Sequence, residues 1–141
     1  MNNVLVDTGY WYAYFNPRDT LHIKAVEMFY YIEMSRVILP FPTLYETLNT
    51  RFIKKEQQLI EIKRLINLSS TVILHDDNYK NAALNLTFED IGPKGRSISL
   101  VDMVIRLMLD DININVNYLI TFNPSDFIDV CQRRNITLIT E

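Results

Sequence analysis

The sequence predicts an α/β fold of three layers, in which a central and mostly parallel sheet of five strands lies between two layers of helices. Five short runs rich in Val, Ile and Leu recur along the chain, and helical patterns separate them. Strands separated by helices are joined by right-handed crossovers, which make the strands parallel. The 141 residues, 48% hydrophobic and 22% charged, are enough for one well-buried core.

The expected elements alternate along the chain. The strands are expected at 3–7, 36–39, 71–74, 117–121 and 136–139. The helical patterns cover 20–34, 42–53, 56–68, 76–88, 99–111 and 124–134, and another helix could begin within 9–15. Each strand is a short apolar run such as "NVLVD" or "TVIL". Two of the helical patterns open with a proline, Pro42 and Pro124, a residue that is favoured at the first position of a helix.

Composition predicts a single domain over residues 1–141 and a cytoplasmic protein without a membrane segment. The three glycines and five prolines are scattered, so no linker divides the chain. Cys131 is alone and cannot form an internal disulfide, and Asp7 interrupts the first apolar run before it could serve as a signal peptide. With a net charge of −3, the chain would need local help, such as a bound cation, to hold an anionic ligand.

Asp7 lies in "VLVDTGYWYAYF", at the exit of the first expected strand. A carboxylate directly after a buried strand is costly to desolvate unless it is hydrogen-bonded, paired or bound to a cation. In one interpretation, Asp7 and Thr8 cap a helix that begins at "GYWYAYF". In the other, Asp7 belongs to a ligand site, because open α/β sheets bind ligands outside the carboxyl ends of their strands.

The stretch "TFNPSDF" follows the fourth expected strand and lies at the same edge of the sheet. It brings Thr121, Asn123 and Asp126 to that edge. These residues also fit a helix start, with Asn123 as N-cap, Pro124 at the first helical position and Asp126 at the third. The sequence leaves both interpretations open.

The segment "SISLVDMVIRLMLDD" predicts a mostly buried helix with one narrow polar stripe. Ser99, Asp102, Arg106 and Asp110 form this stripe at helical spacing. Serine and aspartate are shorter than the Glu and Lys that usually line a solvent-facing stripe. We therefore expect this stripe to line the wall of a cleft. The alternative is that it is a solvated face of the helix.

Glu46, in "PTLYETLN", is a weaker signal, because one acid near the start of a helix is typical of a solvated first turn. Taken together, however, four acids in their local sequence settings resemble the PIN-domain nucleases, and in particular the VapC-like ribonuclease toxins. These acids are Asp7, Glu46, Asp102 and Asp126. The matching pieces cover nearly the whole chain and are "VLVDTGYWYAYF", "RDTLHIKAVEMF", "PTLYETLN", "SISLVDMVI" and "LITFNPSDF".

The resemblance implies that the chain is a metal-dependent endoribonuclease of the VapC toxin type. The acids of such families converge at the carboxyl edge of the sheet and hold one or two Mg²⁺ or Mn²⁺ ions, and these hard ions prefer carboxylate oxygens and water. The implied catalytic and metal-binding residues are Asp7, Glu46, Asp102 and Asp126. Hydrogen-bonding support would come from Thr8, Ser99, Thr121 and Asn123.

The family pattern also implies partners, namely an RNA substrate, a small antitoxin protein that blocks the cleft, and a second copy in a homodimer. Two alternatives remain at this point. The chain could be a housekeeping PIN nuclease that acts in RNA processing or on DNA, or a catalytically silent PIN fold that works as an interaction module. Basic residues in the loop 92–96, together with Arg51, Lys54, Lys55 and Lys63, could meet an RNA backbone, although scattered surface charges usually serve solvation.

Two positions depart from the family pattern. Many relatives carry an acid where Asn123 stands, so either Asn123 or Asp126 could be the fourth site position. Arg106 stands where relatives usually have a small apolar residue. Its guanidinium could pair with Asp102 and compete with the metal, which is the interpretation that we favour, or it could receive a substrate phosphate.

Overall fold

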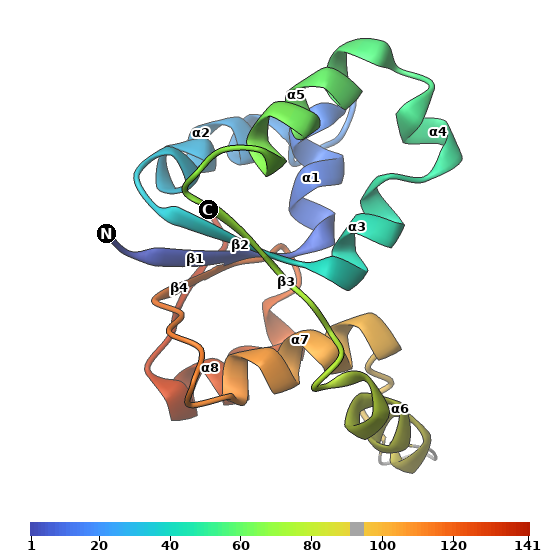
Figure 1. Cartoon of the computed structure of the whole chain (residues 1–141), viewed down its shortest axis with the longest axis vertical. Coiled ribbons are helices and arrows are strands. Elements are labelled where there is room, and N and C mark those ends of the chain that lie inside the picture. The colour runs from blue at the N-terminus through green and yellow to red at the C-terminus, as the bar shows by residue number, and fades with distance from the viewer. Residues whose placement is uncertain (91–94) are drawn as a thin grey trace.

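The central sheet of this computed structural model, which describes residues 1–90 and 95–141, has five parallel strands in the order β3-β2-β1-β4-β5 (Figure 1). The strands are β1 (Asn3–Val6), β2 (Arg36–Pro40), β3 (Thr71–Leu74), β4 (Tyr118–Ile120) and β5 (Thr137–Ile139). All five lie where the sequence predicts them, within a residue or so at each end. The α/β class is therefore confirmed, and the sheet is entirely parallel.

Helices occupy the expected segments between the strands. They are α1 (Thr8–Phe15), α2 (His22–Glu33), α3 (Phe41–Thr47), α4 (Thr50–Ile53), α5 (Glu56–Ile66), α6 (Lys80–Glu89), α7 (Leu100–Asp110) and α8 (Ile128–Arg134), with a 3-10 turn, η1 (Pro124–Asp126), before α8. Among the described residues, none of these helices has the length and apolar character needed to cross a membrane.

Two expected helices are each divided. The pattern 42–53 splits into α3 and α4, because the Asn49 side chain accepts a hydrogen bond from Phe52 N at 3.0 Å and so caps a new helix. The pattern 124–134 splits into η1 and α8. Periodicity alone does not reveal such breaks, because the apolar spacing continues through them.

Side chains of each strand alternate between two cores, one on each face of the sheet. Val4 and Val6 pack with residues of α1, α2 and α5, whereas Leu5 packs with residues of α7 and α8. Figure 1 shows α1, α2 and α5 on one side of the sheet and α6, α7 and α8 on the other. The expected three layers are therefore present.

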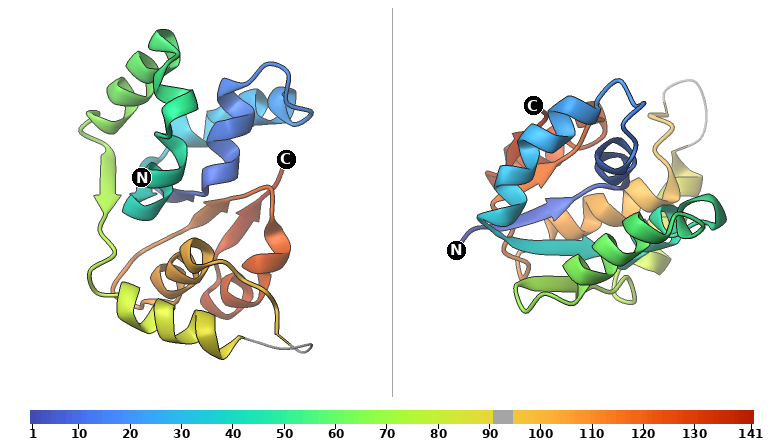
Figure 2. Two further views of the ribbon diagram at one scale, coloured as in Figure 1. Left: turned by 90° about the vertical axis from the view of Figure 1, so that its right-hand side faces the viewer. Right: turned by 90° about the horizontal axis from the view of Figure 1, so that it is seen from above.

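The order in which the strands are added reverses at β1, which lies in the middle of the sheet. The chain passes from β1 to β2 and β3 on one side, and then returns to β4 on the other side of β1. Figure 2 shows β1 and β2 running in the same direction. Ligands of open parallel sheets bind where the strand order reverses, beyond the carboxyl ends. Here that point lies between the ends of β1 and β4, where Asp7 N donates to Ile120 O at 3.0 Å.

Candidate active site

Asp7 directly follows β1 and is 7% exposed. It caps α1, as one interpretation of the sequence predicts, and its Oδ1 accepts a hydrogen bond from Thr8 N at 2.7 Å. Its other oxygen, Oδ2, accepts from the buried Thr121 hydroxyl at 2.9 Å. Burial raises the pKa of Asp7, the hydrogen bonds from Thr121 and Thr8 lower it, and the charges of Glu46 and Asp126 raise it further. Capping therefore does not remove the cost of burying this carboxylate.

Glu46 reaches the same place from α3. Its Oε1 accepts a hydrogen bond from the Thr8 hydroxyl at 3.0 Å, and its side chain is exposed. The expectation of a first-turn glutamate is wrong, because Glu46 lies in the last turn of α3. Thr8 therefore links two of the four acids, since its main-chain N–H contacts Asp7 and its hydroxyl contacts Glu46.

Asp102 lies in the first turn of α7, whose N-cap is Ser99. The Ser99 hydroxyl oxygen accepts from Asp102 N at 3.2 Å. Partial burial, the charges of Asp7 and Asp126, and a side-chain hydrogen bond with Asp126 raise the pKa of Asp102 to about 7, and a hydrogen bond with Ser99 opposes them. The polar stripe of α7 thus begins at Ser99 and Asp102, beside Asp7 and Asp126.

Asp126 ends the η1 turn. The Asn123 side-chain amide donates a short hydrogen bond to its carboxylate, and Asn123 N donates to the Thr121 hydroxyl at 2.9 Å. Pro124 opens η1 as predicted, but the Asn123 side chain makes no capping hydrogen bond. The Asn123 amide thus orients the carboxylate of Asp126.

The four acids come from four separate segments, and Asp7 and Asp102 each lie within electrostatic range of two other acids. The charges of Glu46 and Asp126 act on Asp7, and the charges of Asp7 and Asp126 act on Asp102. Each of the four predicted supporting residues contacts at least one acid: Thr8, Ser99, Thr121 and Asn123. These contacts and charges therefore link the four acids with the four predicted supporting residues, whereas Arg106 has another partner.

Arg106 does not pair with Asp102, so the interpretation that we favoured from the sequence is wrong. Its two terminal nitrogens instead contact the two carboxylate oxygens of Asp129 at 2.7 and 2.8 Å. Nη1 also donates to the main-chain oxygen of Asp126 at 2.7 Å. The pairing raises the pKa of Arg106 and holds the pKa of Asp129 well below its usual range.

Asp129 is a residue of this region that the sequence does not single out. A second arginine, Arg96, contacts Asp129 at 3.2 Å and the main-chain oxygen of Ser125 at 3.0 Å. These pairs join residues 23 to 33 positions apart, so they depend on how α8 packs against α7. The only signal in the sequence is that Asp129 lies three residues after Asp126. Of the basic loop 92–96, residues 92–94 lie outside the described residues.

The donor atoms at the four acids fit a hard divalent cation. Carboxylate and hydroxyl oxygens predominate, and burial together with the charges of neighbouring acids raises the pKa of Asp7 and of Asp102. Within the residues that the structure describes, no three His, Cys, Asp or Glu side chains are gathered closely enough to enclose an ion. Mg²⁺ usually takes only one or two protein carboxylates and keeps several waters, so it does not need three enclosing side chains.

No protein-family model matches this chain, and no curated protein matches it in sequence. The acids and their geometry must therefore carry the functional argument.

Proposed function

We propose that this protein is a Mg²⁺- or Mn²⁺-dependent ribonuclease that hydrolyses phosphodiester bonds, with its active site at Asp7, Glu46, Asp102 and Asp126. The observation that supports this most strongly is the convergence of four acids from separate segments at the point where the strand order reverses. Acids placed together without an opposing charge raise one another's pKa, which is unfavourable for folding unless the site serves a cation.

Asp7 and Asp102 are the residues that would hold the ion, with Glu46 and Asp126 beside them. When bound, Mg²⁺ or Mn²⁺ would lower the pKa of a water molecule and stabilise the charge that develops on the phosphate. The protein itself would orient the ligands. Thr121 and the Thr8 main-chain N–H fix the two oxygens of Asp7, and Asn123 fixes Asp126.

The roles of Arg106 and Arg96 in this proposal are positional. Arg106 binds Asp129 and the main-chain oxygen of Asp126, and Arg96 binds Asp129 and Ser125 O. Together they hold the 125–129 segment against α7, so that Asp126 stays beside Asp102. Arg106 is therefore a positioning residue, and its side chain is already engaged and not free to receive a substrate phosphate.

The physiological role that we propose is that of a toxin held inactive by a small antitoxin protein, and the supporting observation is the resemblance of the sequence motifs to VapC-like toxins. RNA as substrate and a homodimer as the assembly rest on the same resemblance. Co-expression with the product of a small adjacent reading frame should relieve the growth arrest that the protein causes alone. Growth that is unaffected by this protein alone would contradict the toxin role and favour a housekeeping nuclease.

Cleavage of labelled single-stranded RNA by purified protein tests the activity. We expect cleavage in Mg²⁺ or Mn²⁺, none in chelator, and a loss of at least about a hundredfold in Asp102→Asn. The control is Asp110→Asn, which removes an exposed acid two turns further along the same helix and should retain the parent rate. A single-stranded DNA of the same sequence distinguishes a ribonuclease from a deoxyribonuclease. Full activity in Asp102→Asn, or cleavage in chelator, would contradict the proposal.

A further inference from the structure

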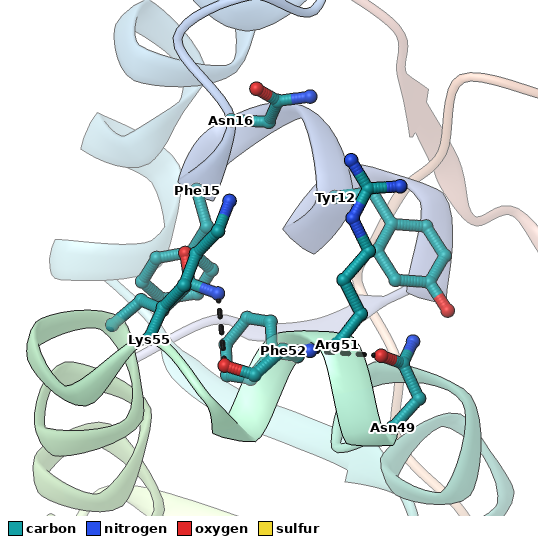
Figure 3. A pocket seen from close by; sticks show the side chains of 8 residues that line it. Tyr12, Phe15, Asn16, Asn49, Arg51, Phe52 and Lys55 are labelled. Carbon is teal, nitrogen blue, oxygen red and sulfur yellow. Dashed lines mark hydrogen bonds between the residues drawn. The ribbon is translucent and has the colours of Figure 1, made fainter.

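A pocket of about 320 Å³ opens between the end of α1 and the segment formed by α4 and the start of α5, next to the main chain of Glu46. Figure 3 shows its lining residues. They are Tyr12, Phe15, Asn16, Asn49, Arg51, Phe52, Lys55 and Gln58. None of the four candidate acids is among them. Ligand pockets commonly measure roughly 300 to 1,000 Å³, so this one suits a single small unit and not a long segment.

Aromatic rings form one wall and the base of the pocket. Phe52 is 6% exposed and packs edge to face against Phe15, with ring centroids 5.3 Å apart. Tyr12 is 40% exposed, so its ring is available at the opening. A fixed ring beside an open pocket is the arrangement on which an unpaired nucleobase stacks.

Two cations flank the opening. Figure 3 shows Arg51 extending toward Tyr12 and Lys55 extending along the opposite side, with Phe52 between their main chains. Five basic residues of the described chain pair with acids, namely Lys24, Lys80, Arg96, Arg106 and Arg133, and Arg51 and Lys55 are among those that do not. Within the described ranges, Arg51 and Lys55 have no acid within 4.0 Å and no acid lines their pocket. In a chain of net charge −3, this pocket is locally positive and suits an anion.

Two residues that line the pocket are linked to the candidate active site through Glu46. The Tyr12 hydroxyl donates to the main-chain oxygen of Glu46, and Asn49 Nδ2 donates to the same oxygen at 2.9 Å. The side chain of Glu46, on the other side, accepts from Thr8 beside Asp7. A chain that passes over the acids would therefore reach this pocket with its neighbouring unit.

We propose that this pocket binds one unpaired nucleotide of the RNA substrate, next to the bond that is cut. The base stacks on the Tyr12 ring, and the phosphate lies between Arg51 and Lys55. This inference rests on the proposed ribonuclease function and adds to it a requirement for single-stranded RNA. A flat ring, two cations and a volume for one unit together favour a nucleotide over an acidic peptide, which would supply the charge but no flat base.

Fluorescence anisotropy with a labelled random-sequence RNA octamer, in chelator, tests the pocket independently of cleavage. We expect Arg51→Ala and Lys55→Ala each to raise the Kd at least about fivefold. Each should also reduce the slope of log Kd against the logarithm of the salt concentration by about one. Tyr12→Ala should raise the Kd about tenfold, whereas Tyr12→Phe keeps the ring and should stay within about twofold. The control Arg36→Ala removes an exposed arginine at the amino end of β2 and should also stay within about twofold.

Several results would overturn the inference. The first is a parent protein that does not bind the octamer, and the second is an equal Kd for Arg51→Ala, Lys55→Ala and Arg36→Ala. The third is tighter binding of a labelled octapeptide of alternating Glu and Leu, which would indicate a protein partner. RNA binding that depends on the pocket, without any cleavage in metal, would support the pocket and contradict the ribonuclease. Cleavage with unchanged Kd values in all the variants would do the reverse.

Discussion

Arg106 on α7 and Asp129 on α8 form a bidentate ion pair, with nitrogen to oxygen distances of 2.7 and 2.8 Å. The Arg106 side chain is 14% exposed and that of Asp129 is 41% exposed. Because the same guanidinium also donates to the main-chain oxygen of Asp126, the pair joins the segment that carries Asp126 to the helix that carries Asp102. Arg106 thus holds the segment that carries Asp126 and does not pair with the carboxylate of Asp102.

Arg106→Ala should lower the free energy of unfolding by about 1.5 to 3 kcal/mol, because it removes three charge-assisted hydrogen bonds from a mostly buried position. The matched control is Arg133→Ala, which breaks the exposed pair with Asp110 between the same two helices and should change the free energy by less than about 1 kcal/mol. Urea unfolding of both variants gives the comparison. Equal losses would show that the Arg106 pair is no stronger than a surface pair.

The same substitution tests the role of Arg106 at the site. Since the guanidinium is not on Asp102, its removal does not free a metal ligand, and Arg106→Ala should not bind Mn²⁺ more tightly than the parent. Titration calorimetry measures this affinity. Tighter Mn²⁺ binding in Arg106→Ala would instead indicate that Arg106 pairs with Asp102 and competes with the metal.

Asp102→Asn should raise the free energy of unfolding in chelator by about 0.5 to 2 kcal/mol, although it abolishes cleavage. The reason is that the asparagine removes a charge that Asp7 and Asp126 repel. Thermal unfolding in chelator measures the change, with Asp110→Asn as the control at an exposed position of α7. A destabilised Asp102→Asn would mean that the carboxylate is satisfied in the metal-free protein.

Stability in chelator should also depend on pH. Asp102 binds its proton more tightly in the folded protein, where its pKa is about 7, than in the unfolded chain, where it is near 3.8. The contribution of the bound proton on Asp102 to the free energy of unfolding is therefore fully present below pH 3.8 and is lost as the pH rises through 7. The parent should become more stable as the pH falls from 7 toward 3.8. Asp102→Asn should show a shallower dependence, and parallel curves for the two proteins would contradict the assignment.

Thr121→Val should destabilise the protein by about 1 to 3 kcal/mol and weaken Mn²⁺ binding. The hydroxyl donates to Asp7 Oδ2 and accepts from Asn123 N in a fully buried position, so its loss leaves both groups without their partner. The control is Thr87→Val, whose hydroxyl only bonds Ala83 O within α6. Thermal unfolding of the two variants distinguishes a site-specific loss from the general effect of removing a threonine hydroxyl.

Much of this architecture follows from local pattern. The five strands are predicted within a residue or so because each is a short apolar run, and the alternation of Val4, Leu5 and Val6 between two cores follows from the strand repeat. The edge at which Asp7 and Thr121 meet follows from parallel topology. Helix breaks such as the one before α4 depend on a single side-chain cap, and the apolar period does not encode them.

The partners of charged side chains are what the sequence does not predict. Asp102 and Arg106 share a helix face, and local spacing favours a pair between them. In the fold, α8 brings Asp129 to Arg106 from 23 residues away, while Asp102 turns toward Asp7 and Asp126. The choice between two acids depends on how helices pack, which is a property of the whole domain.

Titration calorimetry of Mn²⁺ into the metal-free protein tests most directly whether the four acids form a divalent-cation site. We expect the parent to bind Mn²⁺, Asp110→Asn to bind it with equal affinity, and Asp102→Asn to bind it at least about tenfold more weakly. Parent protein that does not bind Mn²⁺ in the millimolar range, or an Asp102→Asn variant that binds it as tightly as the parent, would contradict the claim.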